Sequence, residues 1–333
     1  MLQLFRSNQF LSNILYIPYL IAFALISYYQ GMFPQEINPI FSGFFGDKMS
    51  SLLGSLSPLQ LIIAGNTLVF LQAVALNILC SLHNLCKENN LLPGLFYCLL
   101  ISFTSQNIYL TDVLIANIFL LFSINEVLSG YKSLDGFKRI FNSGLWISVA
   151  SLFHFSIIGL AIWAFISILQ LRSFRAKERI ALLLSLIIPY YLVGVYFYTT
   201  NQWDLFLNKL PWKDLFPLSF GSIGLAELPI LSLFALFVVL ILINSRLLIQ
   251  KRQMQTQRKV RVVVNFLLVS LLLFLFDMDD IPSFLQLICL PLAILFGGYF
   301  SVISKKWGEV YHFILLLLCL GLKGNFLLDF FLN

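Results

Sequence analysis

The chain has 333 residues, of which 59% are hydrophobic and only 11% charged. Soluble domains carry about 25% charged residues, and a single apolar core stops growing near roughly 250–300 residues. The mean hydropathy of the chain is +0.90. These values exclude a soluble globular domain and indicate an integral membrane protein that has lipid as its solvent.

The net charge of +6 comes from an excess of lysine and arginine. Membrane proteins collect such an excess in their cytoplasmic loops, so membrane lipid is the expected partner and nucleic acid is not. The five cysteines lie in or beside apolar runs and form no CxxC pair. We therefore expect small buried side chains there and no cysteine metal site.

Ten apolar segments are candidates for membrane helices, because a bilayer core about 30 Å thick needs about 20 apolar residues in a helix. Two of them, 91–105 and 262–276, are short for a full crossing. The predicted fold is an all-α, polytopic transmembrane helical bundle with about 10–11 membrane segments, forming one domain over residues 1–333. The ten segments are 11–30, 57–82, 91–105, 108–128, 142–170, 179–199, 226–245, 262–276, 281–303 and 308–323.

The cations predict the orientation of the chain. With a cytoplasmic N-terminus, a cytoplasmic basic loop at 244–261 and external loops at 31–56 and 200–225, seventeen of the 21 lysines and arginines are cytoplasmic. This sorting follows the usual bias, provided that segment 142–170 turns back on itself.

Segment 142–170 has clusters of cations on both sides, and its length allows two short helices, about 142–153 and 156–170. Their junction is His154-Phe155-Ser156. Non-helical backbone at membrane depth is tolerated only where protein or a watery cavity surrounds it. We therefore predict a hairpin with a candidate site at its tip; the alternative is one ordinary span.

Three acidic residues are candidates for chemistry. Glu36 and Asp47 lie in the predicted first external loop, where a carboxylate can act as a general base or bind a metal; ordinary solvation of the loop is the favoured alternative. Asp112 lies at a predicted membrane boundary, where an acid is energetically costly and often functional. Its alternative role is that of a helix N-cap.

His154 is the candidate at the hairpin tip. An imidazole can bind phosphate, ligate a metal or shuttle protons, and the alternative is a hydrogen-bonded packing residue. The acidic run Asp277-Met278-Asp279-Asp280 is a candidate for a divalent cation, although a solvated turn is the favoured interpretation. The chain contains no P-loop, GxSxG, HExxH or dinucleotide fingerprint.

Residues Tyr97–Leu169 resemble the central part of the GT-C membrane glycosyltransferases. Those enzymes pair two short helices and then carry a small-residue-rich helix that runs into an external turn with a basic residue. Here Ser105–Tyr131 and Ser143–Ser156 occupy these places. Ala150–Ser156 is also similar to the A-x-x-F-H-x-S stretch of EpsG-type polysaccharide polymerases. The whole-chain pattern, which begins Met1-Leu2-Gln3-Leu4-Phe5-Arg6, is similar to a family of polytopic inner-membrane proteins of Bacteroidota with no established activity.

These resemblances imply a bacterial inner-membrane protein with its functional face in the periplasm. They make Asp47 or Glu36 the base that activates an acceptor, and Asp112 a group that supports the acceptor or a metal. His154 then faces the phosphate of a polyprenyl-linked sugar donor, with Asn107 and Ser156 as further substrate-binding residues.

Three hypotheses for function remain open. The leading one is a membrane enzyme of cell-envelope glycan assembly that transfers or polymerises sugars from a polyprenyl-phosphate-linked donor, with a divalent cation as the candidate cofactor. The second is a non-enzymatic scaffold that binds other subunits of an envelope complex. The third is a transporter, which ranks last because the sequence shows neither an intramembrane charge pair nor an inverted repeat.

Overall fold

The computed structural model is helical throughout its described regular structure, with no strand in those residues. This confirms the all-α fold class. The described residues are 5, 10–29, 43–86, 90–104, 109–131, 133, 135–171, 176–209, 232, 235–241, 243, 253–276 and 281–323. The helices are η1 (Phe10–Leu15), α2 (Tyr16–Tyr29), α3 (Gly46–Leu53), α4 (Pro58–Leu82), α5 (Leu92–Thr104), α6 (Asp112–Ser129), α7 (Gly136–Ser151), η2 (Phe155–Gly159), α8 (Leu160–Leu171), α9 (Ala176–Thr199), α10 (Trp203–Lys209), α12 (Met254–Phe276), α13 (Ile281–Phe300) and α14 (Lys305–Lys323).

Four of these helices, α4, α6, α9 and α13, are long and apolar enough to cross a membrane. Shorter apolar helices cover Ser12–Leu25, Leu92–Thr104 and Phe155–Leu171. The edge helix α9 exposes large apolar side chains such as Ile187 and Leu192, which lipid tails accept and water does not. Length and composition therefore mark the chain as a membrane protein, and the number of ten or eleven segments stays a prediction.

Helices α5 and α13 form the centre of the bundle. Every residue of α5 is buried, as is every residue of α13 except Pro282 and Tyr299, and a helix that is apolar on all sides belongs in an interior. The two helices approach closely, because a Cβ on Gly297 would lie 2.5 Å from Pro93 Cγ. With 13 residues, α5 is roughly 20 Å long. This length suffices because α5 contacts protein instead of lipid, which explains the short apolar run at 91–105.

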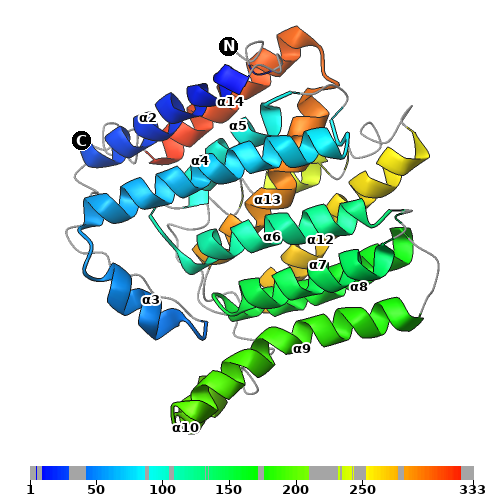
Figure 1. Cartoon of the computed structure of the whole chain (residues 1–333). Helices are drawn as coiled ribbons and strands as arrows, with labels where there is room; N and C mark the ends of the chain where they lie inside the picture. Colours follow the sequence, from blue (N-terminus) through cyan, green and yellow to red (C-terminus); the bar gives the residue numbers. More distant parts are fainter. Residues whose placement is uncertain are drawn as a thin grey trace.

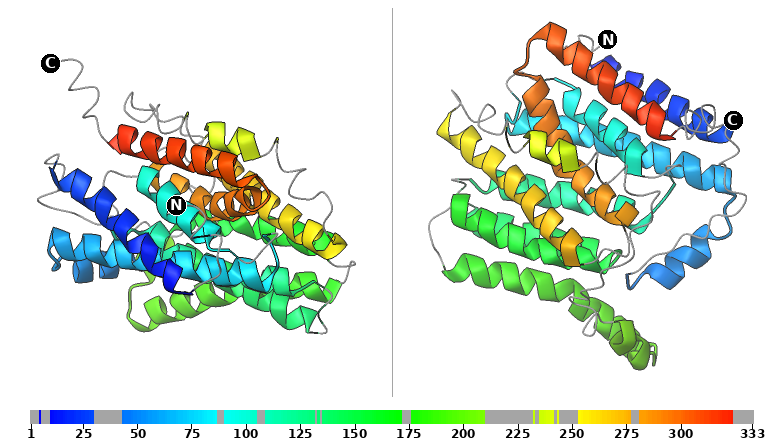
Figure 2. Two further views of the ribbon diagram at one scale, coloured as in Figure 1. Left: turned by 90° about the horizontal axis from the view of Figure 1, so that it is seen from above. Right: turned by 180° about the vertical axis from the view of Figure 1, so that it is seen from behind.

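The other helices surround this pair in a regular order. Figure 1 shows α2 and α14 along one edge, then α4, α6, the pair α7 and α8, and finally α9 along the opposite edge. The view from behind in Figure 2 shows α12 alongside α13. At the first edge the rings of Tyr19 and His312 are 6.1 Å apart and hold α2 against α14.

Segment 142–170 is a hairpin, as predicted. Helix α7 ends at Ser151, the chain turns through Leu152, Phe153 and His154, and η2 leads into α8. Helices α7 and α8 run in opposite directions side by side (Figure 1). Helix α7 begins earlier than predicted, at Gly136. Lys138 and Arg139 lie in its first turns, and lysine and arginine favour helix.

Several predicted loops are partly helical. The end of the predicted basic loop 244–261 is helical, since α12 begins at Met254; the lysine, arginine and glutamine residues there favour helix. Residues 244–252 lie outside the described residues. Short helices α3 and α10 lie within the predicted external loops. Most of segment 226–245 lies outside the described residues, and its described part at 235–241 is helical.

Charged residues sort to two ends of the bundle, here called the Asp112 end and the Lys259 end. The Asp112 end contains the N-terminal ends of α4, α6 and α13 and the turn between α7 and α8 (Figure 1). The Lys259 end contains the C-terminal ends of α4 and α6 and the N-terminal ends of α7, α9 and α12. Most cations of the described residues lie at the Lys259 end: Lys138, Arg139, Lys177, Arg179, Arg258, Lys259 and Arg261.

Candidate functional site

The structure brings together two residues that the sequence predicted separately. Nδ1 of His154 lies 3.0 Å from Oδ2 of Asp112, although 42 residues separate them in the chain. His154 is 4% exposed and Asp112 is 3% exposed. A buried acid paired with a buried imidazole at the end of a membrane helix bundle is a strong candidate for a functional site.

The N-terminus of α6 positions Asp112. Thr111 is the N-cap residue, and its hydroxyl accepts a hydrogen bond of 3.1 Å from the Leu114 N–H. The alternative role of Asp112 as the N-cap is therefore wrong. Oδ1 of Asp112 accepts from the Val113 N–H at 2.7 Å, which leaves Oδ2 for His154. The positive end of the helix dipole also favours a carboxylate at this position.

The turn of the hairpin positions His154. Its backbone is extended, with φ −138° and ψ 111°, and its N–H donates to the Ala150 carbonyl at 3.3 Å. The imidazole lies edge-on to the ring of Phe284, with 6.1 Å between the ring centroids. His154 is thus enclosed by α6, by its own hairpin and by the start of α13.

The first loop is hydrogen-bonded to this turn, and this contact is here called the seal. The Gly43 N–H donates to the Phe153 carbonyl at 2.9 Å, and the Phe45 N–H donates to the Leu152 carbonyl at 3.4 Å. Carbonyls at the end of a helix need such partners where water is excluded. The ring of Phe45 also packs 5.4 Å from that of Phe153. Gly43 is required here, since a Cβ would lie 2.5 Å from the Phe153 carbonyl carbon.

We expect Gly43→Ala to detach the first loop from the hairpin turn, because the added methyl group collides with backbone atoms that cannot move aside. Hydrogen–deuterium exchange of amides in residues 43–53 should become at least about tenfold faster, which corresponds to the loss of about 1.4 kcal/mol. Leu56→Ala, at an exposed position in the same region, is the matched control. Unchanged exchange in Gly43→Ala would contradict the proposed seal.

The other predicted site residues are placed as follows. Asp47 lies in the first turn of α3, two residues after Phe45, so its backbone is close to the sealed turn. Its side chain lies outside what the structure describes, as do Glu36, Asn107 and the acidic run at 277–280. Ser156 is half-buried in η2, two residues after His154. Among the described residues, no group of three or more His, Cys, Asp or Glu side chains could hold a metal ion.

A network of uncharged polar side chains continues from the pair into the bundle, and sequence reasoning missed it in part. The Thr111 hydroxyl donates to Gln286 Oε1 at 2.7 Å, and Asn117 Nδ2 donates to the Gln286 carbonyl at 3.3 Å. Asn117 also lies 3.4 Å from the Tyr97 hydroxyl, which donates to Gln72 Oε1 at 2.6 Å. The network joins α4, α5, α6 and α13. Its signal in the sequence is a set of single polar residues within apolar runs.

The chemistry of the pair follows from its donors and acceptors. An ionised carboxylate only accepts hydrogen bonds, so Nδ1 of His154 carries a proton when Asp112 is charged. Nε2 is then the ring atom that exchanges a proton with another group. A carboxylate that orients an imidazole in this way is the arrangement of a general base, and it is equally able to relay protons. Because both side chains are shielded from water, their electrostatic interaction is strong.

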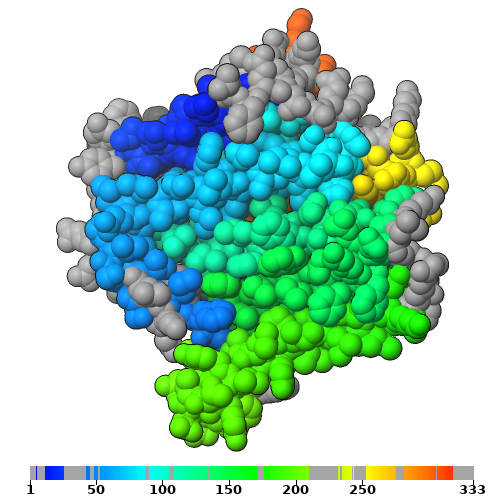
Figure 3. Space-filling view, in the orientation of Figure 1, coloured from blue at the N-terminus to red at the C-terminus, as the bar shows by residue number. Residues whose placement is uncertain are grey.

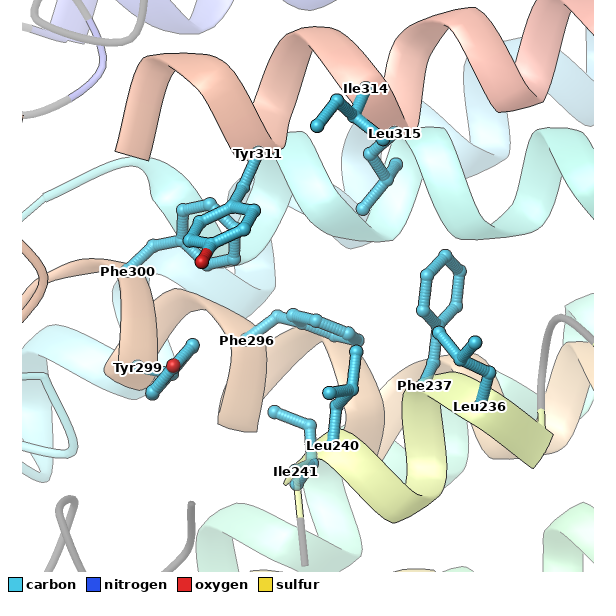
Figure 4. A pocket seen from close by; sticks show the side chains of 10 residues that line it. All are labelled: Leu236, Phe237, Leu240, Ile241, Phe296, Tyr299, Phe300, Tyr311, Ile314 and Leu315. Atoms are coloured by element: carbon cyan, nitrogen blue, oxygen red, sulfur yellow. The ribbon is translucent and has the colours of Figure 1, made fainter. Parts of the chain in front are cut away.

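A separate apolar pocket has different chemistry. It has a volume of about 300 Å³ and lies between α13, α14 and the helical residues 235–241. Figure 4 shows Tyr299 and Tyr311 at one side and Leu236 and Phe237 at the other. Among the described residues, its lining contains no carboxylate, imidazole or amine, and the hydroxyls of Tyr299 and Tyr311 are its polar side-chain groups. A lining of this kind suits a hydrocarbon. Asp112 and His154 therefore remain the candidate active site.

Comparison with known proteins adds no family to this description. No protein-family model matches the chain, and no curated protein and no solved structure shows significant similarity to it. The resemblance to GT-C glycosyltransferases therefore stays a prediction.

Proposed function

We propose that the chain is a multi-pass membrane enzyme of the cell envelope that transfers a sugar from a polyprenyl-phosphate-linked donor to a hydroxyl acceptor. The observation that carries the proposal is the buried hydrogen bond between Asp112 and His154. Transfer to a hydroxyl group needs a base at the acceptor oxygen. An imidazole oriented by a carboxylate supplies one.

In this proposal the roles differ from those implied by resemblance. Asp112 orients His154, and Nε2 of His154 removes the proton of the acceptor hydroxyl. The acceptor oxygen forms a bond to the anomeric carbon while the bond from that carbon to the phosphate oxygen breaks. The polyprenyl phosphate leaves with the bonding electron pair, and the proton remains on His154. Asp47, at the start of α3 beside the sealed turn, is the candidate to contact the acceptor.

The proposal places the Asp112 end in the periplasm of a bacterial inner membrane and the N-terminus in the cytoplasm. Its support is the gathering of cations at the Lys259 end, because cations favour the cytoplasmic side.

The test uses the full-length protein in proteoliposomes with a short-chain polyprenyl-phosphate hexose as donor. We expect Asp112→Asn and His154→Gln each to lower the transfer rate by about 100-fold or more, as the loss of a general base does. Glu126→Gln, whose carboxylate lies at the opposite end of α6, is the matched control and should retain activity. Full activity of both site variants would overturn the proposal. An equal loss of transfer activity in Glu126→Gln would instead show that the substitutions act on the structure of the protein and not on chemistry at Asp112 and His154. That outcome would favour a scaffold.

A proton-coupled transporter is the second candidate. This candidate ranks last by sequence because the chain shows no intramembrane charge pair. In the structure, the Asp112–His154 pair and the break in the helix between α7 and α8 are features that transporters use. The same proteoliposomes distinguish the two candidates under a pH gradient. Proton flux that disappears in Asp112→Asn, without any sugar transfer by the original protein, would favour transport.

A further inference from the structure

A second buried titratable cluster lies at the Lys259 end, where α4, α6 and α12 meet. Nζ of Lys259 is 3.1 Å from Nδ1 of His83, and Nε2 of His83 is 3.0 Å from Oδ1 of Asn125. Lys259 is 7% exposed and His83 is 6% exposed. Both lie just beyond the apolar stretches of their helices, and residues in that position lie beside lipid headgroups when such a stretch fills the hydrocarbon core.

The partner of Lys259 does not neutralise its charge. Burial lowers the pKa of His83 to about 4; the hydrogen bond to Asn125 opposes this shift, and the nearby charges of Lys259 and Arg139 add to it. At pH 7 the imidazole is therefore neutral, so Nε2–H donates to Asn125 and Nδ1 accepts from the ammonium group. Within the described part of the chain, Lys259 makes no ion pair with a carboxylate. A lysine has three N–H donors, and His83 takes one.

More positive charge surrounds this cluster. A guanidinium nitrogen of Arg139 is 3.0 Å from Glu126 Oε2, which uses one of its five N–H donors. The guanidinium of Arg258 lies over the ring of Tyr131, 5.9 Å from its centroid. Of these groups, Lys259, Arg139 and Arg258 are cations, and Glu126 is a carboxylate that pairs with Arg139. Figure 3 shows the first turns of α12, in yellow, beside the end of α4 at the right-hand edge of the molecule.

We propose that the junction of α4, α6, α7 and α12 binds the phosphate group of an anionic membrane lipid, with Lys259 and Arg139 as its main ligands. A shielded cation that pairs with no carboxylate of the described residues is costly, and a phosphate supplies both a counter-charge and acceptors for the remaining N–H donors. The position of the cluster at headgroup level favours a lipid over free phosphate. This proposal is independent of the proposed function at the Asp112 end.

The test measures the thermal unfolding midpoint of the full-length protein in nanodiscs of phosphatidylcholine, with and without phosphatidylglycerol. We expect phosphatidylglycerol to raise the midpoint of the original protein by several degrees, because a ligand that binds the folded state stabilises it. Lys259→Met should lose most of this rise. In phosphatidylcholine alone it should be at least as stable as the original protein, since an uncompensated charge has been removed.

Lys138→Met is the matched control, because Lys138 is an exposed cation at the same end and its loss should leave the lipid-dependent rise intact. Arg139→Gln provides a second variant and should lose part of the rise. The proposal is overturned if Lys259→Met and Arg139→Gln both keep the full rise in the unfolding midpoint, or if all three variants lose it equally.

The same measurement in neutral detergent with added inorganic phosphate distinguishes a lipid phosphate from free phosphate as the ligand. A Lys259-dependent rise there, without one from phosphatidylglycerol, would replace the lipid by free phosphate.

Discussion

Alanine in place of Asp112 is expected to lower the free energy of unfolding by about 3 kcal/mol, the cost of removing one partner from a buried pair. The His154 imidazole, which is buried in the original protein, would lose the carboxylate oxygen that lies 3.0 Å from its Nδ1. It also removes the side-chain acceptor of the Val113 N–H at the start of α6. The measurement is unfolding in mixed micelles, followed by the circular dichroism of the helices.

A double-mutant cycle separates the pair from its surroundings. His154→Ala should also destabilise the protein, and the double variant should lose less than the sum of the two single losses. We expect a coupling energy of about 1–2 kcal/mol, at the upper end of what polar pairs contribute inside membranes. Strict additivity would show that the two side chains do not stabilise each other, and would also weaken the proposal that Asp112 orients His154.

Valine in place of Gly144 is expected to have an effect of similar size on the other side of the hairpin. Gly144, Ser148 and Ser151 form a stripe of small residues on α7 that faces α9. A Cβ on Gly144 would lie 2.9 Å from Leu182 Cδ1 and would collide with the Ser185 hydroxyl. The close approach supports two hydrogen bonds of 2.7 Å, from Ser148 to the Leu186 carbonyl and between the Ser151 and Tyr190 hydroxyls.

Forcing α7 and α9 apart should lower the free energy of unfolding by about 3 kcal/mol, because overpacking a close helix contact strains both backbones and breaks the hydrogen bonds beside it. Leu145→Val is the matched control, since Leu145 is half-buried at the next position of α7. It should change stability by less than about 1 kcal/mol. Equal stability of the valine and control variants would show that α7 and α9 do not depend on the small-residue contact.

The sequence predicted the hairpin because its cations could not otherwise be sorted to one side, and that reasoning also selected His154. Asp112 was selected by its position at a helix boundary. Their direct contact could not be predicted, because it depends on how α6 packs against the turn, and no local pattern encodes that packing. The hydrogen bonds from Gly43 and Phe45 to the turn could not be predicted from the sequence either, because they join backbone atoms that are distant in the chain.

Other features were open to misinterpretation because hydropathy treats each helix alone. The short run at 91–105 suggested a partial crossing, yet α5 is short because α13 and its neighbours surround it. His83 occupies the C-cap position of α4. Its contact with Lys259 was not predictable, because α12 was expected to begin after that lysine.

The seal between the first loop and the hairpin has a consequence for the order of assembly. Domains and segments made first at the ribosome are available to those made later. Gly43 and Phe45 precede the carbonyls of Leu152 and Phe153 by more than 100 residues, so their N–H groups have already been synthesised when the turn emerges. The turn between α7 and α8 can therefore form its backbone hydrogen bonds with the first loop as soon as the turn is made. A chain in which α7 and α8 came first would leave these carbonyls without their donors until the first loop was made.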